Sequence, residues 1–146
     1  MKLFACAKIS GNKDFPQLSG TAHFYQGPSD GIWVEVEVTG LPDSDSSGPG
    51  NFYGLHIHEH GDCSLPFDHT GEHYNPTHMP HPKHAGDLPV LLGNNGYAFL
   101  ICYTNRLTAD EILQKSIIIH SGADDFVSQP SGNAGSKIGC GVIIPC

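Results

Sequence analysis

Positively charged residues are scarce in this chain of 146 residues, which holds 7 Lys and Arg against 15 Asp and Glu, a net charge of -8. No stretch gathers the basic residues that nucleic acids or anionic membranes attract. No apolar run approaches the roughly 18 residues that a membrane-spanning helix needs. We therefore expect neither a nucleic acid nor a membrane as a partner.

The five cysteines contain no CxxC pair, which argues against zinc ribbons and thioredoxin-like redox sites. The chain also lacks the MxCxxC motif of copper-transfer domains. An odd number of cysteines leaves at least one thiol free, and the sequence alone does not fix which residues pair. Lys8 interrupts the apolar run that a signal peptide would require. The expected location is cytoplasmic if Met1 is the native start, and extracytoplasmic if a signal peptide has been removed.

Glycine and proline are abundant, with 18 and 11 residues, and only 38% of the residues are hydrophobic. This composition argues against helical bundles and coiled coils, and it is typical of short strands joined by many turns. The length fits a single domain over residues 1–146. We expect an all-β fold, a Greek-key β-barrel or sandwich of about eight antiparallel strands with two long functional loops.

The clearest strand is IWVEVEV, residues 32–38, in which apolar and polar residues alternate with a period of two. Thr108, with Glu111 three residues later, fits a capping box and predicts one short helical turn. Loops are expected at residues 41–50, 60–95 and 121–139. Further strands are expected at residues 2–9, 18–26, 52–58, 97–103, 116–120 and 141–144.

Most of the ten histidines lie between residues 56 and 84. His56 and His58 are two residues apart in an expected strand, so both rings point to one face and can hold one metal ion. A pair of surface histidines would give the same pattern. With His73, and with His120 at the end of another expected strand, the set becomes four imidazoles without a sulfur ligand. Such a set suits Cu(II).

A second group of metal-ligand residue types lies in the expected 60–95 loop and consists of His73, His81, His84 and Asp87. Three imidazoles and one carboxylate suit a tetrahedral zinc site. His78 is an alternative for the middle position. A polar loop without a metal would also contain many histidines and prolines. Metal ligation would explain how so long a loop is ordered.

Five motifs extend this pattern over most of residues 54–144. They are GLHIHEHGDC (54–63), GEHYNP (71–76), HAGDLP (84–89), IIIHSGADD (117–125) and GNAGSKIGCGVI (132–143). In this order they resemble the copper/zinc superoxide dismutase family. The short step from His58 to Cys63 is more similar to the bacterial branch of that family than to the animal one.

The resemblance implies two adjacent metal sites that share His73. The implied copper ligands are His56, His58, His73 and His120. The implied zinc ligands are His73, His81, His84 and Asp87, in a zinc loop that is shorter than usual. Asp124, with Asp125 as the alternative, would hydrogen-bond His56 and His81. Cys63 would pair with Cys140, which leaves Cys6, Cys102 and Cys146 as extra thiols.

The resemblance also implies an activity, the dismutation of superoxide to oxygen and hydrogen peroxide. A copper ion would be reduced and oxidised in turn beside a structural zinc, with His73 carrying a proton. The family usually has an arginine where this chain has Lys137, so we expect catalysis to be slower by about tenfold, or about 1.4 kcal/mol. The alternative is a non-catalytic, zinc-stabilised binding or interaction domain. Members of the family are often homodimers, and the sequence does not decide the state of this chain.

Overall fold

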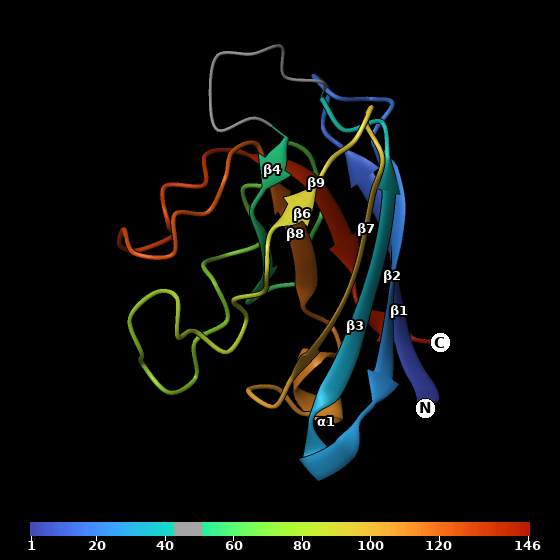
Figure 1. The fold of residues 1–146 in the computed structure, drawn as a ribbon, viewed down its shortest axis with the longest axis vertical. Helices are drawn as coiled ribbons and strands as arrows, with labels where there is room; N and C mark the ends of the chain where they lie inside the picture. The colour runs from blue at the N-terminus through green and yellow to red at the C-terminus, as the bar shows by residue number, and fades with distance from the viewer. Residues whose placement is uncertain (43–50) are drawn as a thin grey trace.

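The computed structural model describes residues 1–42 and 51–146, and its main feature is one curled antiparallel sheet (Figure 1). Its eight strands follow the order β5-β8-β9-β1-β2-β3-β7, with β10 added beside β1, and a separate pair is formed by β4 and β6. The strands are β1 (Lys2–Gly11), β2 (Ser19–Gln26), β3 (Ile32–Thr39), β4 (Phe52–Tyr53), β5 (Leu55–His58), β6 (Leu91–Leu92), β7 (Ala98–Thr104), β8 (Ser116–His120), β9 (Lys137–Val142) and β10 (Ile144–Pro145). The expected all-β Greek-key barrel is confirmed.

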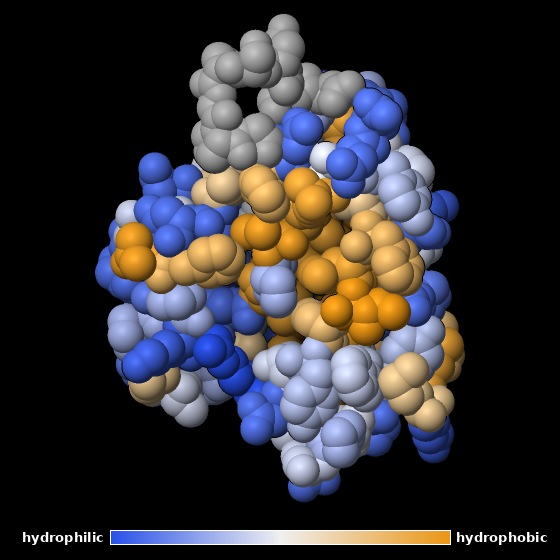
Figure 2. All heavy atoms as spheres, in the orientation of Figure 1, coloured by the Kyte–Doolittle hydropathy of each residue, from blue (hydrophilic) through white to orange (hydrophobic). Residues whose placement is uncertain are grey.

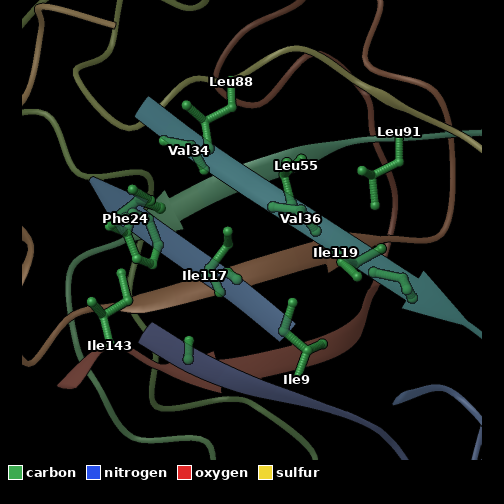
Figure 3. Packing of buried hydrophobic residues seen from close by; sticks show 14 of the residues in the cluster. Ile9, Phe24, Val34, Val36, Leu55, Leu88, Leu91, Ile117, Ile119 and Ile143 are labelled. Atoms are coloured by element: carbon green, nitrogen blue, oxygen red, sulfur yellow. The ribbon is translucent and has the colours of Figure 1, made fainter. Parts of the chain in front are cut away.

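The core lies on the concave side of this sheet. In β3 the predicted alternation is confirmed, because its four aliphatic residues are fully buried and the residues between them are not. Side chains from β1, β2, β5 and β8 meet this face, among them Phe24, Leu55 and Ile117 (Figure 3). Each fully buried side chain of this kind contributes about 1.5–3 kcal/mol relative to an exposed one. A core shared by five strands fixes the positions of β5 and β8, which carry three of the predicted ligands.

The last long strand differs from the prediction. Residues 121–139 were expected to be a loop and 141–144 a strand, but β9 already begins at Lys137 and ends at Val142. The glycines of β9 lie where neighbouring atoms leave no room for a side chain, and not in a turn. A Cβ at Gly141 would lie 2.8 Å from the carbonyl oxygen of Lys8, and one at Gly139 would lie 3.1 Å from the Leu18 side chain. Close packing against β1 therefore explains a strand that reads as a loop.

Two smaller features complete the connections. The expected 60–95 loop contains the short strand β6, which pairs with β4. The predicted capping box opens the helical turn α1 (Ala109–Ile112), where the Thr108 N–H donates to the Glu111 carboxylate at 2.8 Å. Most of the expected loop at 41–50 lies outside the described residues. Among the described residues no helix is long and apolar enough to cross a membrane.

The two long loops extend to one side of the sheet, at the left of Figure 1. The first is tied to the sheet by a disulfide between Cys63 and Cys140, which are 77 residues apart. The loop side of the molecule is mostly hydrophilic, whereas hydrophobic residues gather in the middle of the face seen in Figure 2, over β6 and β7. The loops and the adjacent ends of β5 and β8 together form the candidate site.

Candidate metal centre

Two neighbouring strands place three histidines side by side. His56 and His58 come from β5, and His120 ends β8, the strand hydrogen-bonded to β5. The His120 N–H donates to the Gly54 carbonyl at 2.8 Å, which brings the end of β8 level with the start of β5. All three side chains are buried.

The first long loop adds its ligands by folding back along β5. Isolated backbone bridges join His58 to His73 and His56 to Asp87. The loop thus occupies the free edge of β5 and supplies ligands opposite the strand's own histidines. His84 and His81 lie between these bridges in sequence, and both are buried.

The first donor group unites His56, His58, His73 and His120, whose ligand atoms lie within 4.8 Å of one another. The Nε2 atoms of His58 and His120 are only 3.2 Å apart. The ring of His73 stacks on that of His56 with 3.8 Å between centroids. These are the four residues that the sequence predicts as copper ligands.

The outer nitrogens of two of these rings decide where their protons sit. His58 Nδ1 donates to the Gly71 carbonyl at 2.9 Å, and His120 Nδ1 donates to the Gly135 carbonyl at 3.1 Å. Burial lowers the pKa of His58 to about 2 and that of His120 to about 3, so both rings are neutral and hold one proton each. Their two Nε2 atoms therefore face each other as bare lone pairs. A cation between them removes that repulsion.

The other two rings also present free nitrogens. His56 Nε2 is bonded to Asp124 at 2.7 Å, and its Nδ1 is buried without a hydrogen-bond partner. His73 Nε2 is likewise buried and unpartnered. Buried polar atoms of this kind normally have a partner. Four converging nitrogens with no sulfur among them fit a copper ion.

The second donor group lies on the other side of the His73 ring. His73 Nδ1 is 2.9 Å from Asp87 Oδ1 and 3.2 Å from His84 Nδ1. The other oxygen of Asp87 is 3.1 Å from His81 Nδ1 and 3.2 Å from His84 Nδ1. Burial would raise the pKa of Asp87, but the hydrogen bond from His73 and the adjacent histidines lower it, which favours the carboxylate. Three nitrogens and one carboxylate fit zinc.

His56 and His84 compete for the fourth place in this second group. The residues whose donor atoms all lie within 4.8 Å of one another are His56, His73, His81 and Asp87. His56, however, has only one nitrogen left once Nε2 is bonded to Asp124, so it can serve one metal ion. His84 Nδ1 faces both His73 and Asp87, which makes His84 the better fourth ligand.

Asp124 connects the two groups from behind. Its oxygens accept from His56 Nε2 at 2.7 Å and from His81 Nε2 at 2.8 Å. Burial disfavours its charge, but the donors of His56, His81 and Phe126 outweigh burial and hold the pKa of Asp124 well below its usual range. Of the alternatives left open by the sequence, Asp125 is exposed, and so is His78. The structure thus brings Asp124 and His81 to the site, and neither alternative.

A cavity of about 430 Å³ opens onto the first donor group and is lined by His58, His73, His120 and Lys137 among others. Lys137 Nζ donates to Thr70 Oγ1 at 2.7 Å and to the Gly71 carbonyl at 3.2 Å. Burial lowers the pKa of this ammonium. The same Gly71 carbonyl also accepts the hydrogen bond from His58 Nδ1, so Lys137 and His58 share one acceptor.

The sequence analysis missed two supports of the zinc-loop backbone. Gln129, from the second long loop, accepts from the His81 N–H at 2.9 Å and donates to the His81 carbonyl at 2.8 Å. Arg106 donates to the carbonyls of Pro82 at 2.6 Å and of His84 at 3.3 Å. Bonds of side chains to distant backbone leave no pattern in the sequence that could have revealed them.

The family model described as copper/zinc superoxide dismutase (SODC) matches residues 18–143. The chain belongs to the copper/zinc superoxide dismutase family. A Cu-Zn superoxide dismutase of Deinococcus radiodurans is 37% identical over 148 residues, which covers 86% of this chain and 77% of that protein. The solved structure of the clock protein EA4 superposes with a TM-score of 0.82 at 28% identity, covering 98% of this chain and 94% of that one.

The extracellular Cu-Zn superoxide dismutase of Mus musculus is 34% identical over 140 residues, which covers 89% of this chain. The chain spans about half of that relative, 55% of its length. As the family's description leads one to expect, the two donor groups of this chain are suited to two different metals. The nitrogen-only group suits copper, and the mixed nitrogen and oxygen group suits zinc.

Proposed function

We propose that this chain converts superoxide to oxygen and hydrogen peroxide. The observation that carries the proposal is the set of four buried nitrogens, with their lone pairs turned inward, at the end of a cavity that also exposes a lysine. Family membership supports the same reaction. The two substrate molecules and two protons enter by this cavity.

Copper would be held by His56, His58, His73 and His120, and zinc by His73, His81, His84 and Asp87. Bound copper supplies the one-electron chemistry that the reaction needs, because zinc has no second accessible oxidation state. The chain's own residues orient the ligands. Gly71, Gly135 and Asp124 take up the outer N–H groups of four rings, and this fixes the tautomers of His58, His120, His56 and His81.

His73 is placed to carry a proton. Its Nδ1 faces the zinc group, and its Nε2 faces the copper group beside the cavity. We propose that Nε2 accepts a proton in one half of the cycle and returns it to the product in the other. With zinc held by His73, Asp87, His81 and His84, the ring would stay in place while Nε2 changes its proton.

Lys137 draws the anionic substrate into the cavity. The net charge of -8 repels superoxide, so a local positive charge must outweigh it at the site. Lysine keeps the charge of the family's usual arginine but lacks its planar fork. Its ammonium already donates to Thr70, to Gly71 and, at 3.5 Å, to the Phe67 carbonyl. We propose a rate about tenfold below the diffusion-limited range, a cost of about 1.4 kcal/mol.

The decisive experiment measures superoxide decay by pulse radiolysis, per bound copper, on the chain loaded with copper and zinc. The reference is the same chain loaded with zinc alone. A copper-dependent rate far above the reference supports the dismutase. A rate equal to the reference with copper bound contradicts it and favours the alternative, a non-catalytic zinc-stabilised domain. Copper content after purification without added metal gives an independent readout.

A further inference from the structure

The two ends of the chain lie side by side (Figure 1). The terminal strand β10 pairs with β1 in antiparallel register, with Cys6 opposite Ile144 and Ala5 opposite Pro145. One residue further, the Cys146 N–H donates to the Phe4 carbonyl at 3.2 Å. The last residue of the chain is thus held against the start of the first strand.

Cys6 and Cys146 share one face of this strand pair. Ala5 and Ala7 point into the core and are buried, so Cys6, between them, points to the outer face, where it is partly exposed. Cys146 lies two residues beyond the partner of Cys6 and therefore on the same face. The nearby Cys146 side chain raises the pKa of the Cys6 thiol, which agrees with this placement of the two side chains.

The other cysteines are arranged differently. Cys63 and Cys140 already form a disulfide. Cys102 lies in β7, with two strands between it and β1. Burial raises its pKa to about 11, which keeps it a thiol. Of the three free cysteines in the part of the chain that the structure describes, only Cys6 and Cys146 lie on neighbouring segments, at the pairing of β1 with β10.

We propose that Cys6 and Cys146 are a site of oxidation by hydrogen peroxide, which joins them in a second disulfide and fastens the C-terminal strand to β1. The exposed Cys146 thiol first attacks the peroxide bond, giving a sulfenic acid and one water molecule. The Cys6 thiol then attacks the sulfenic sulfur, forming the disulfide and releasing a second water. The two thiols lose two electrons and two protons, and peroxide is reduced to water.

The oxidant is the product that the proposed function would release, so its cellular source rests on that function, whereas the bond itself does not. Cys146 is exposed, so a disulfide there is open to reducing thiols, and exposed disulfides are the more reducible ones. The site is therefore reversible.

The test adds hydrogen peroxide to the full chain, loaded either with copper and zinc or with zinc alone. A mild reductant first returns Cys6, Cys102 and Cys146 to free thiols and is removed before the oxidation. The free thiols are then alkylated in denaturant and counted by mass spectrometry. Three thiols react before oxidation. We expect one afterwards, with a mass lower by two hydrogen atoms. After trypsin, peptide 3–8 should stay joined to peptide 138–146 until reductant is added.

Two variants decide what the link contains, because peptide 138–146 also carries Cys140. Cys102→Ser should oxidise as the parent chain does. Cys146→Ser should release peptide 3–8 after trypsin. The proposal is overturned if peptide 3–8 is free in the parent chain, if it stays linked in Cys146→Ser, if the bond joins two chains, or if it forms only with copper bound. The added peroxide makes each outcome independent of any dismutase activity.

Discussion

At the residue scale, the position of a single proton decides which nitrogen of each histidine can bind a metal ion. A neutral imidazole carries one N–H, and whichever nitrogen donates it leaves the other as a ligand. In His58 and His120 the carbonyls of Gly71 and Gly135 take that donor. In His56 and His81 the carboxylate of Asp124 takes it. The ligands are therefore prepared for metal by the hydrogen bonds behind them.

Asp124→Asn should weaken the binding of at least one of the two metals. An amide offers one oxygen and one N–H₂ group where the carboxylate offers two oxygens, so it cannot accept from both His56 and His81. One of the two rings must change tautomer or turn. We expect copper or zinc affinity to fall by about 10- to 100-fold, as measured by chelator competition.

The matched control for this substitution is Asp125→Asn. Asp125 is the next residue, is exposed, and makes its hydrogen bonds with Val127 and Ser128 in its own loop. Both affinities should stay at the parent value. Equal affinities in Asp124→Asn and the parent chain would show that the tautomers are fixed by something else.

Lys137 is the residue whose charge should set the rate of substrate entry. Lys137→Glu should lower the second-order rate by at least about tenfold and change its dependence on ionic strength. Lys137→Arg should raise it by up to about tenfold. Pulse radiolysis over a salt series measures both effects.

Lys83→Glu is the control for Lys137→Glu, because it changes the net charge equally from an exposed position in the first long loop. It is absent from the lining of the cavity that contains Lys137. We expect a much smaller loss of rate. Identical losses in the two variants would assign the effect to net charge, and no loss in either would remove Lys137 from substrate steering.

At the scale of elements, alternating strands could be predicted and glycine-rich ones could not. β3 has a period of two because one of its faces meets the core. β9 is rich in glycine because β1 approaches it closely at Gly141, and only the tertiary contact reveals this. A short strand inside the first long loop, β6, was missed for a similar reason, since its partner β4 is distant in sequence.

The candidate site was more predictable than the fold around it. The predicted ligands are clustered around His73, because ligand chemistry restricts residue type and the five motifs mark their positions. The elements that hold the zinc loop were not predictable. Gln129 makes two hydrogen bonds to the backbone of His81, and nothing in the sequence around Gln129 indicates that role.

Gln129→Ala tests whether one loop holds the other. The substitution removes both hydrogen bonds to the His81 backbone, at about 1 kcal/mol each. Where these hydrogen bonds form only in the zinc-bound chain, their removal should lower zinc affinity by up to about 30-fold. Copper affinity should change less. Zinc competition with a chromophoric chelator measures this. Gln17→Ala, at an exposed position in the turn before β2, should leave both affinities unchanged, and zinc binding equal to the parent in Gln129→Ala would contradict the role of this clamp.

At the scale of the whole molecule, the two donor groups lie between the sheet and the loops. Eight of the residues around them are polar, buried and drawn from β5, β8 and both long loops. Without metal, the bare Nε2 atoms of His58 and His120 face each other at 3.2 Å in the interior. Removing the metals should therefore destabilise the entire fold, because no single element carries the site alone.

Thermal unfolding with and without chelator measures this coupling. A metal present at a thousand times its dissociation constant adds about 4 kcal/mol to stability, and in a domain of this size each kcal/mol shifts Tm by about 2–4 °C. We expect Tm to rise by about 8–16 °C on loading with zinc and further with copper.

His81→Ala should lose most of the zinc increment, because His81 Nδ1 faces Asp87 in the second donor group. His78→Ala should keep it, because His78 is exposed. An unchanged Tm on chelation would mean that the donor groups are satisfied without metal, and a loss in His78→Ala would move the zinc site to the other histidine.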